Sequence, residues 1–308
     1  MDLSPTHFHL LLNHFPTIGF IIGLAIYVIS LFGGTHHHLK QAALVVFVAI
    51  SLITLPTYVT GNGAAEALLG SEGISQKLME MHEGAALISL MLMEITGLFA
   101  WLALWQLRRS GRVTRPTSAI VLILAFATLL LVARAAALGG EIRHPEIRVT
   151  QEAPTEQLAR VIGNYVRDTP WVWVVCESLH FVGLTLVIGV MLIVDLRMLG
   201  VVRGIPFTAL DRLLPWAIIG FGVNVITGML FFAAASGQYT NNPAFIWKLI
   251  FLMAAGANTL YFTFDKTLTL DARAEAPMLS KALAMSALVL WVGVMFWGSM
   301  LPFIGNAF

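Results

Sequence analysis

The sequence predicts an all-α integral membrane protein with eight transmembrane helices, arranged as two tandem, parallel four-helix units with both termini outside. Three observations support this fold class. Of the 308 residues, 58% are hydrophobic and only 11% are charged, whereas a soluble domain carries about 25% charged residues. Eight long apolar runs divide the chain. The pair His14-Phe15 recurs 166 residues later as His180-Phe181, again near the start of an apolar run.

Each apolar run is long enough to cross a bilayer core, which takes about 20 helical residues. The runs cover residues 10–33, 40–60, 82–107, 117–138, 171–199, 213–235, 244–264 and 280–303. Stretches rich in glycine, or containing proline, punctuate them and are predicted to form turns or loops. These stretches are Gly33-Gly34, Gly61-Asn62-Gly63, Ser110-Gly111, Gly139-Gly140, Gly204-Ile205-Pro206, Ser236-Gly237 and Ala276-Pro277.

The repeat divides the chain into two halves. Adding 166 to the first four runs gives segments that nearly coincide with the last four, and Val59-Thr60-Gly61 has a counterpart in Ile226-Thr227-Gly228. Because four is an even number, both copies should have the same orientation, related by an axis along the membrane normal. We therefore expect a four-helix unit at 1–138, a charged linker at 139–170 with an amphipathic helix over 155–166, and a second four-helix unit at 171–308.

Lysine and arginine are unevenly distributed between the two sets of loops. Because cytoplasmic loops are enriched in these residues, the richer set should face the cytoplasm, and both termini and the 139–170 segment should face outward. Eleven basic residues fall in one set and five in the other. The first set holds Lys40, Arg108, Arg109, Arg112, Arg115, Arg197, Arg203, Arg212, Lys266, Arg273 and Lys281, and the second Lys77, Arg143, Arg148, Arg160 and Arg167.

Composition excludes several classes of protein. A net charge of +1 does not provide the concentrated basic face of a nucleic-acid binder. The single cysteine, Cys176, rules out a disulfide framework within the chain and a Cys-x-x-Cys-His site for covalent haem attachment.

The histidines at helix starts are the first candidate site. His14 and His82 begin the first and third runs, which should enter the membrane from the same side. Two imidazoles on different helices of a bundle can serve as the axial ligands of one haem b, and Arg134 is a candidate partner for a haem propionate. A copper or zinc site using His7 and His9 with His14 is an alternative. The structural alternative is that each histidine only caps a helix or hydrogen-bonds a neighbour.

The second half offers a related but different pair. The repeat relates His14 to His180 and His82 to Lys248, with 68 residues between the members of each pair. Because lysine is not among the usual haem ligands, this half is expected to have lost its metal and to hold a propionate, a quinone head group or a lipid phosphate. Simple snorkelling of Lys248 to the interface is the alternative.

Glu94 lies inside the third apolar run. A carboxyl group at this depth must be protonated or paired, and such residues often line proton paths. We treat Glu94 as a candidate proton relay, with a neutral structural hydrogen bond as the alternative.

Several motifs carry a resemblance. His14-Phe15-Pro16, Met81-His82-Glu83-Gly84 and Leu179-His180-Phe181-Val182-Gly183, with the segment 194–200, resemble those of a broad group of uncharacterised bacterial polytopic inner-membrane proteins over most of the chain. In layout, the first half is similar to four-helix b-type cytochromes, which ligate haem by histidines on different helices. Such cytochromes often carry two histidine pairs on opposite sides of the membrane, whereas this chain offers one pair on one side.

Together these features favour a b-type cytochrome-like electron-transfer subunit of the bacterial inner membrane. It would bind one non-covalent haem b and pass electrons between the quinone pool and a periplasmic cytochrome or copper protein, as a non-catalytic subunit of an oxidoreductase complex. One alternative is a membrane anchor or assembly subunit without a cofactor, which binds other subunits of a larger complex. A small-solute transporter is the other alternative, although matching broken helices, the usual sign of a transporter site, are not evident.

Overall fold

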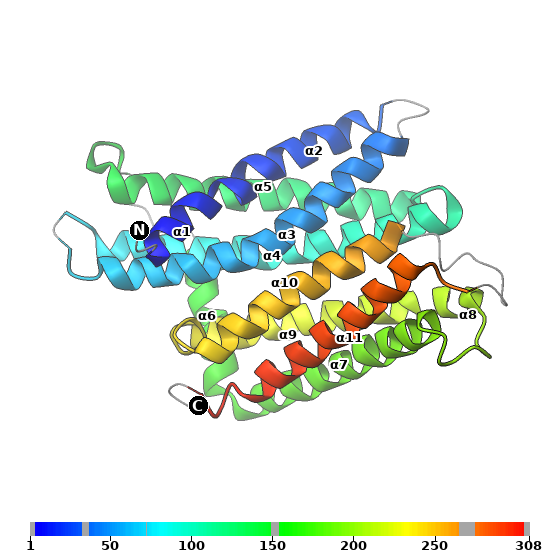
Figure 1. Cartoon of the computed structure of the whole chain (residues 1–308). Coiled ribbons are helices and arrows are strands. Elements are labelled where there is room, and N and C mark those ends of the chain that lie inside the picture. The colour runs from blue at the N-terminus through cyan, green and yellow to red at the C-terminus, as the bar shows by residue number, and fades with distance from the viewer. Residues whose placement is uncertain (1–3, 33–36, 72, 149–153, 265–274, 305–308) are drawn as a thin grey trace. The chain divides into compact units, whose positions relative to one another are not determined.

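The computed structural model describes residues 4–32, 37–71, 73–148, 154–264 and 275–304, and all regular secondary structure in these ranges is helical (Figure 1). The predicted turn at Gly33-Gly34 and the basic residues Lys266 and Arg273 lie outside the described residues. The elements are α1 (Pro5–Leu12), the π-helix η1 (Phe15–Gly19), α2 (Phe20–Ile29), α3 (His37–Leu68), α4 (Gln76–Ser110), α5 (Arg115–Arg143), the 3₁₀ helix η2 (Pro145–Ile147), α6 (Pro154–Asp168), α7 (Pro170–Met198), α8 (Phe207–Asp211), α9 (Leu214–Thr240), α10 (Pro243–Phe264) and α11 (Met278–Ser299).

Eight helical stretches of the described chain are long and apolar enough to cross a membrane. The all-helical class, the number of spans and the multi-pass membrane character predicted from sequence are therefore confirmed. The stretches run over Pro5–Ile29, His37–Leu68, Gln76–Ser110, Arg115–Ile142, Pro170–Met198, Phe207–Thr240, Pro243–Phe264 and Met278–Ser299.

Two of the predicted turns are wrong, because Gly61-Asn62-Gly63 lies inside α3 and Gly139-Gly140 lies inside α5. Ser236-Gly237 forms no loop, but the backbone of Ala235 directly before it is non-helical (φ −146°, ψ 42°), so α9 is kinked there. In a membrane every backbone polar group needs an internal partner, so a helix continues through glycines that would end it in water. By contrast, Gly111 does end α4, with a φ of 68° and its N–H bonded to the Leu107 carbonyl, and the two predicted loops at 204–206 and 276–277 are also confirmed.

The chain forms two compact units. The first comprises Met1–Trp173 with Met229–Thr240, and the second comprises Val174–Gly228 with Asn241–Phe308. The division falls inside α7, and the 139–170 segment belongs to the first unit.

In the first unit, α1 and α2 follow one another along α3, which packs on α4, and α4 packs on α5 (Figure 1). The fully buried rings of Phe20, Tyr27 and Phe47 hold α2 against α3, with Phe47 centred 5.1 Å from Phe20 and 5.9 Å from Tyr27. The Tyr27 hydroxyl lies 2.9 Å from Ser118 Oγ of α5. Buried aromatic packing and this polar contact fix the helices that carry the candidate site.

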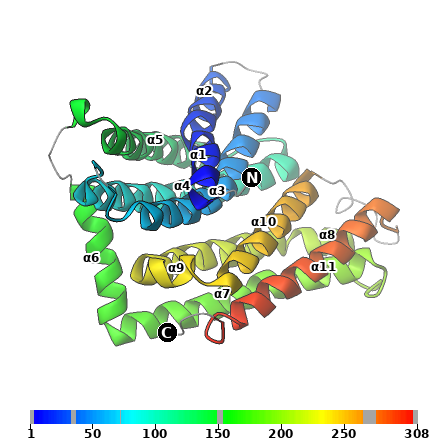
Figure 2. The same ribbon diagram turned by 60° about the vertical axis from the view of Figure 1, so that its left-hand side comes forward.

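The predicted amphipathic helix over 155–166 is confirmed as α6, which Figure 2 shows steeply inclined to α4. Its buried face includes Ala159 and Val166, and Gly163 between them approaches the Ala233 carbonyl at the end of α9 so closely that a Cβ would lie 2.5 Å away. Its exposed residues are mixed, since the apolar side chains of Leu158 and Val161 are exposed beside polar ones, and Arg160 pairs with Glu80 of α4 at 3.8 Å. An exposed pair at this distance contributes little, so apolar packing holds α6 in place.

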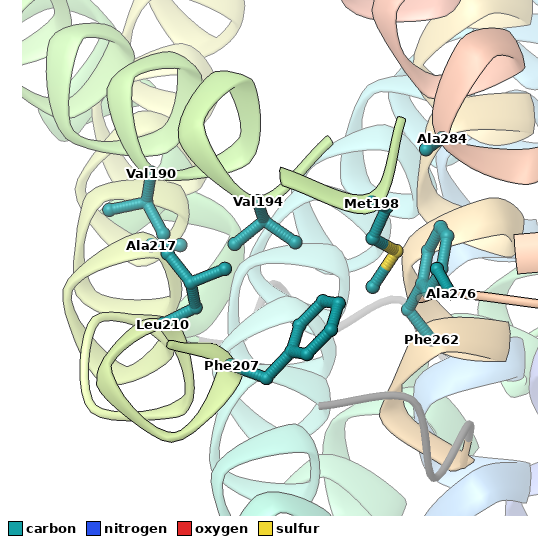
Figure 3. Close-up of a cluster of buried hydrophobic side chains, with 9 residues drawn as sticks. All are labelled: Val190, Val194, Met198, Phe207, Leu210, Ala217, Phe262, Ala276 and Ala284. Atoms are coloured by element: carbon teal, nitrogen blue, oxygen red, sulfur yellow. The ribbon is translucent and has the colours of Figure 1, made fainter. Parts of the chain in front are cut away.

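The second unit has an apolar core at one end of its helices. Figure 3 shows the side chains of Val194 and Met198 from α7 turned toward Phe207 of α8. The Arg197 guanidinium covers the Phe207 ring at 4.0 Å and donates through Nε to the Ile205 carbonyl. The remaining members of the core are Val190, Leu210, Ala217, Phe262, Ala276 and Ala284.

Asn242 caps α10, and its removal should destabilise this unit. The buried Asn242 Oδ1 accepts the Ala244 N–H, and Nδ2 donates to the Leu301 carbonyl, both at 2.9 Å. We expect Asn242→Ala to lower the free energy of unfolding by about 1–2 kcal/mol because a helix cap and a second buried bond are lost. Thermal unfolding in detergent measures the loss. Asn242→Ser keeps a cap acceptor without burying a carboxylate against the Leu301 carbonyl, so it should lose less; equal losses would show that the cap contributes nothing.

Candidate functional site

The first unit brings two imidazoles together at one end of its helices. His9 of α1 donates from Nδ1 to the Thr57 carbonyl of α3 at 3.0 Å, and His82 of α4 donates from Nδ1 to the Ala135 carbonyl of α5 at 2.8 Å. The two rings lie close enough to interact electrostatically. A carbonyl oxygen can only accept, so each Nδ1 carries the proton and each Nε2 carries the lone pair of the neutral ring.

A glycine lies beneath each ring. A Cβ at Gly61 would lie 3.0 Å from Cε1 of His9, and a Cβ at Gly139 would lie 3.2 Å from Cε1 of His82. In both helices the glycine follows the accepting carbonyl, of Thr57 or Ala135, by four residues. Helical side chains tilt toward the N-terminus, so a side chain at the fourth position would cover that carbonyl. Glycine leaves the carbonyl open to the imidazole.

Charged side chains lie at the same end of the first unit. Arg134 directly precedes Ala135, is partly buried and has interactions of its own. Glu83 follows His82, hydrogen-bonds Ser236 and interacts electrostatically with Glu66 and Glu80. Arg134 and several carboxylates therefore lie at the same end of the first unit as the histidine pair.

The other histidines expected at this end lie differently. His14 is exposed at the junction of α1 and η1, where its backbone carbonyl accepts from Thr17 Oγ1 at 3.0 Å. His7 is exposed, with Nδ1 2.8 Å from Ser4 Oγ. Within the described ranges, no group of three or more His, Cys, Asp or Glu side chains is placed to hold a metal ion. Ligation by His14 stays a prediction, and His9 is the histidine that interacts electrostatically with His82.

Of the acidic side chains buried in the described helices, Glu94, Glu141 and Asp195, two have oxygens without a hydrogen-bond partner. Glu94 of α4 is 4% exposed, and its Oε1 has no hydrogen-bond partner in the described part of the chain. Asp195 of α7 is fully buried, and neither of its carboxyl oxygens has a hydrogen-bond partner in the described part of the chain. The proton-relay role of Glu94 stays a prediction.

The second unit contains the related pair of His180 and Lys248. His180 of α7 lies 2.8 Å from Thr227 Oγ1 of α9 through Nδ1, with Gly228 beside the ring. Lys248 of α10 lies against Gly298 of α11 and interacts electrostatically with His180. Two features of the first unit recur here. An imidazole is hydrogen-bonded to the next membrane-spanning helix, and a basic side chain lies beside a glycine of the last one. In these contacts His180 takes the position of His9 rather than that of His14.

Between α5 and η2, His144 is exposed and lies outside this arrangement. Its Nδ1 is 3.0 Å from Glu146 Oε1. The backbone N–H of Glu146, and then His144, lower the pKa of this carboxyl group. The pair is a local surface contact next to η2.

No protein-family model, curated protein or solved structure matches this chain. The function is therefore inferred from the contacts at the two polar pairs. Sequence reasoning included His9 only as an alternative copper ligand and missed the role of Gly61 and Gly139. A usable signal was present, because each glycine directly follows an apolar run, at the end that should lie on the same side as the histidine-bearing helix starts.

Proposed function

We propose that this chain is a membrane-embedded electron-transfer protein that binds one haem b between His9 and His82. One observation carries the proposal: both rings donate from Nδ1 to backbone carbonyls of neighbouring helices. Histidines that ligate metals commonly donate their other ring N–H in this way, which fixes the tautomer and the ring orientation. Two such imidazoles on separate helices of a bundle suit the two axial positions of a haem.

The residues present fit this group. His9 and His82 would supply neutral Nε2 ligands, and the carbonyls of Thr57 and Ala135 would hold both rings against rotation. Arg134, adjacent to the His82 anchor, would pair with a propionate. When bound, the haem iron supplies one-electron redox chemistry whose potential depends on its axial ligands and surroundings.

The excess of Lys and Arg in the other loops supports an outer location for this end. In a bacterial inner membrane, the partner would be a periplasmic cytochrome or copper protein, and the quinone pool would exchange electrons with the chain. Glu66 and Glu80 are exposed near the histidine pair, and carboxylates there would favour encounter with a basic partner.

The test is a reduced-minus-oxidised visible spectrum of the detergent-purified protein, with a pyridine haemochrome assay for stoichiometry. We expect a b-type spectrum and one haem per chain. A colourless protein, expressed with ample haem, would contradict the proposal. If such a protein retained a second subunit through purification, it would instead favour the anchor function.

The glycines should act as positioning residues for the imidazoles. Gly61→Ala and Gly139→Ala place a methyl group 3.0 Å and 3.2 Å from the histidine rings, so each ring must shift by a few tenths of an ångström. We expect haem to be retained, with altered g-values in electron paramagnetic resonance and a shifted midpoint potential. Gly63→Ala is the matched control, because its methyl group meets Pro5 at the same 3.0 Å and no histidine. Equal spectra in all three variants would refute the positioning role.

A further inference from the structure

The hydrogen bonds around His180 define its tautomer. Thr227 Oγ1 donates its single proton to the Val223 carbonyl at 2.7 Å. It can therefore only accept from His180 Nδ1, which lies 2.8 Å away. Because Nδ1 then carries the ring proton, Nε2 is the basic, accepting nitrogen of the neutral imidazole.

Lys248 provides a donor in the same part of the unit, because Val187 and Ala255, which lie seven residues after His180 and Lys248 respectively, belong to one buried cluster. The ammonium group of Lys248 lies near the start of α10, with Nζ 3.6 Å from the position of a Cβ at Gly298. In the part of the chain that the structure describes, His180 is the titratable group with which Lys248 interacts, and no carboxylate pairs with it. A cation held without a carboxylate in a membrane helix is by default a candidate functional site.

We infer that His180 and Lys248 bind the head group of a quinone-type electron carrier. A single phenolic oxygen can donate its proton to Nε2 of His180 and accept a hydrogen bond from Lys248, whereas the carbonyl of the oxidised ring can accept from Lys248. The inference rests on the proposed function, because it locates the membrane-soluble carrier that exchanges electrons with the chain.

Two other ligands fit the pair less well. The phosphodiester of a phospholipid has no proton at neutral pH, so it would pair with Lys248 but set an anionic oxygen against the lone pair of Nε2. A second haem would need a neutral amine, whereas a lysine ammonium group has donors and no lone pair. The pairing of a donor, the Lys248 ammonium group, with an acceptor, Nε2 of His180, favours a ligand that bears a hydroxyl group.

Aromatic side chains adjoin the pair in sequence. Trp247 precedes Lys248 and stacks on Trp297, which precedes Gly298, with centroids 5.8 Å apart and an interplanar angle of 19°. Phe296 meets Trp297 edge-on at 5.2 Å. Trp247 is 47% exposed and Phe296 is 52% exposed, so a planar ring can reach them from the lipid. The tryptophans also report binding, because a bound quinone quenches their fluorescence.

The experiment titrates the full-length protein, in nanodiscs of neutral lipid, with a decyl-substituted dimethoxybenzoquinone and follows tryptophan fluorescence. We expect saturable quenching that the corresponding hydroquinone reverses by competition, and a smaller quenchable signal in Trp247→Phe. Lys248→Met should weaken quinone binding about tenfold or more, since a charge-assisted bond is lost, and Lys248→Arg should restore most of it. His180→Phe should weaken binding of the hydroquinone more than that of the quinone.

Lys281→Met is the matched control, because Lys281 lies at the opposite end of α11 from Gly298 and pairs with Glu275 at 3.3 Å. Quenching that rises linearly and equally in all variants would overturn the inference. So would displacement of the quinone by anionic phosphatidylglycerol without any dependence on His180, or a stoichiometry of two haems per chain.

The same titration on the His82→Ala variant separates this inference from the proposed function. Saturable quenching there supports the quinone site whether or not haem binds elsewhere. A coloured wild-type protein with unsaturable quenching would overturn the quinone site and leave the haem site standing.

Discussion

Replacing His82 with alanine should leave the purified protein without haem, and replacing His9 should do the same. Each substitution would remove one of the two imidazoles proposed to hold the haem, and it leaves the carbonyl of Ala135 or Thr57 without its imidazole donor. Changes to the groups that only support a ligand weaken metal binding by about 10- to 100-fold, so loss of the ligand itself should exceed this. The visible spectrum at equal protein concentration measures the loss, and size-exclusion chromatography checks that the variants remain folded.

His14→Ala distinguishes the two possible ligand pairs. His14 lies on the same membrane span as His9, but its side chain is exposed. The His14→Ala variant should therefore keep the full haem spectrum. If His14→Ala lost its haem while His9→Ala kept it, the sequence-derived pair of His14 and His82 would be correct and the pair inferred from the contacts would be wrong. Since imidazole can enter a vacated cavity, added imidazole should restore part of the colour to His82→Ala.

The largest expected effect on stability comes from the crossing of α7 and α9 in the second unit. A Cβ at Gly183 would lie 2.8 Å from the Gly220 carbonyl oxygen, and a Cβ at Gly220 would lie 2.8 Å from the Gly183 carbonyl oxygen. Small residues allow such close approach of helices in membranes. Because the obstructing atoms are backbone atoms and cannot rotate away, we expect Gly183→Leu to cost about 3 kcal/mol of unfolding free energy.

Gly189→Leu provides the control on the same helix. The space around Gly189 is open, since no atom of the described residues lies within 4 Å of the position that a Cβ would take. The substitution should therefore change stability by less than about 0.5 kcal/mol. Thermal or denaturant unfolding in one detergent, followed by tryptophan fluorescence, compares the two. Similar midpoints for both variants would show that the two helices do not depend on this contact.

The fold class was predictable because long apolar segments identify membrane helices by composition alone. Helix ends were less predictable, since Gly61 and Gly139 end helices in water but continue them in an apolar environment. Composition does not reveal the rotation of a helix about its axis. His9 and His14 are five residues apart and so project about 140° apart around a regular helix, and η1 further changes that relation. The sequence could thus predict which helix end carries the candidate site, but not which of its histidines lies near His82.

The second pair was predictable in a different way. The repeat related His82 to Lys248, and the structure places Lys248 within electrostatic reach of His180. The partner of His180 Nδ1 could not be inferred, because it depends on the hydroxyl of Thr227 and on the carbonyl that this hydroxyl already uses. The full burial of Asp195 could not be predicted from the sequence either, because it depends on how other helices pack around α7.

The attachment of His9 and His82 to main-chain carbonyls has a consequence for the speed of electron exchange. Side chains can swing when the charge of a neighbouring centre changes, whereas a carbonyl inside a helix is held by the whole helix. Fixed dipoles of this kind need little rearrangement when charge appears or disappears beside them. A redox centre between these two rings would therefore have a small reorganisation energy, set by the stiffness of α3 and α5 rather than by the mobility of either histidine.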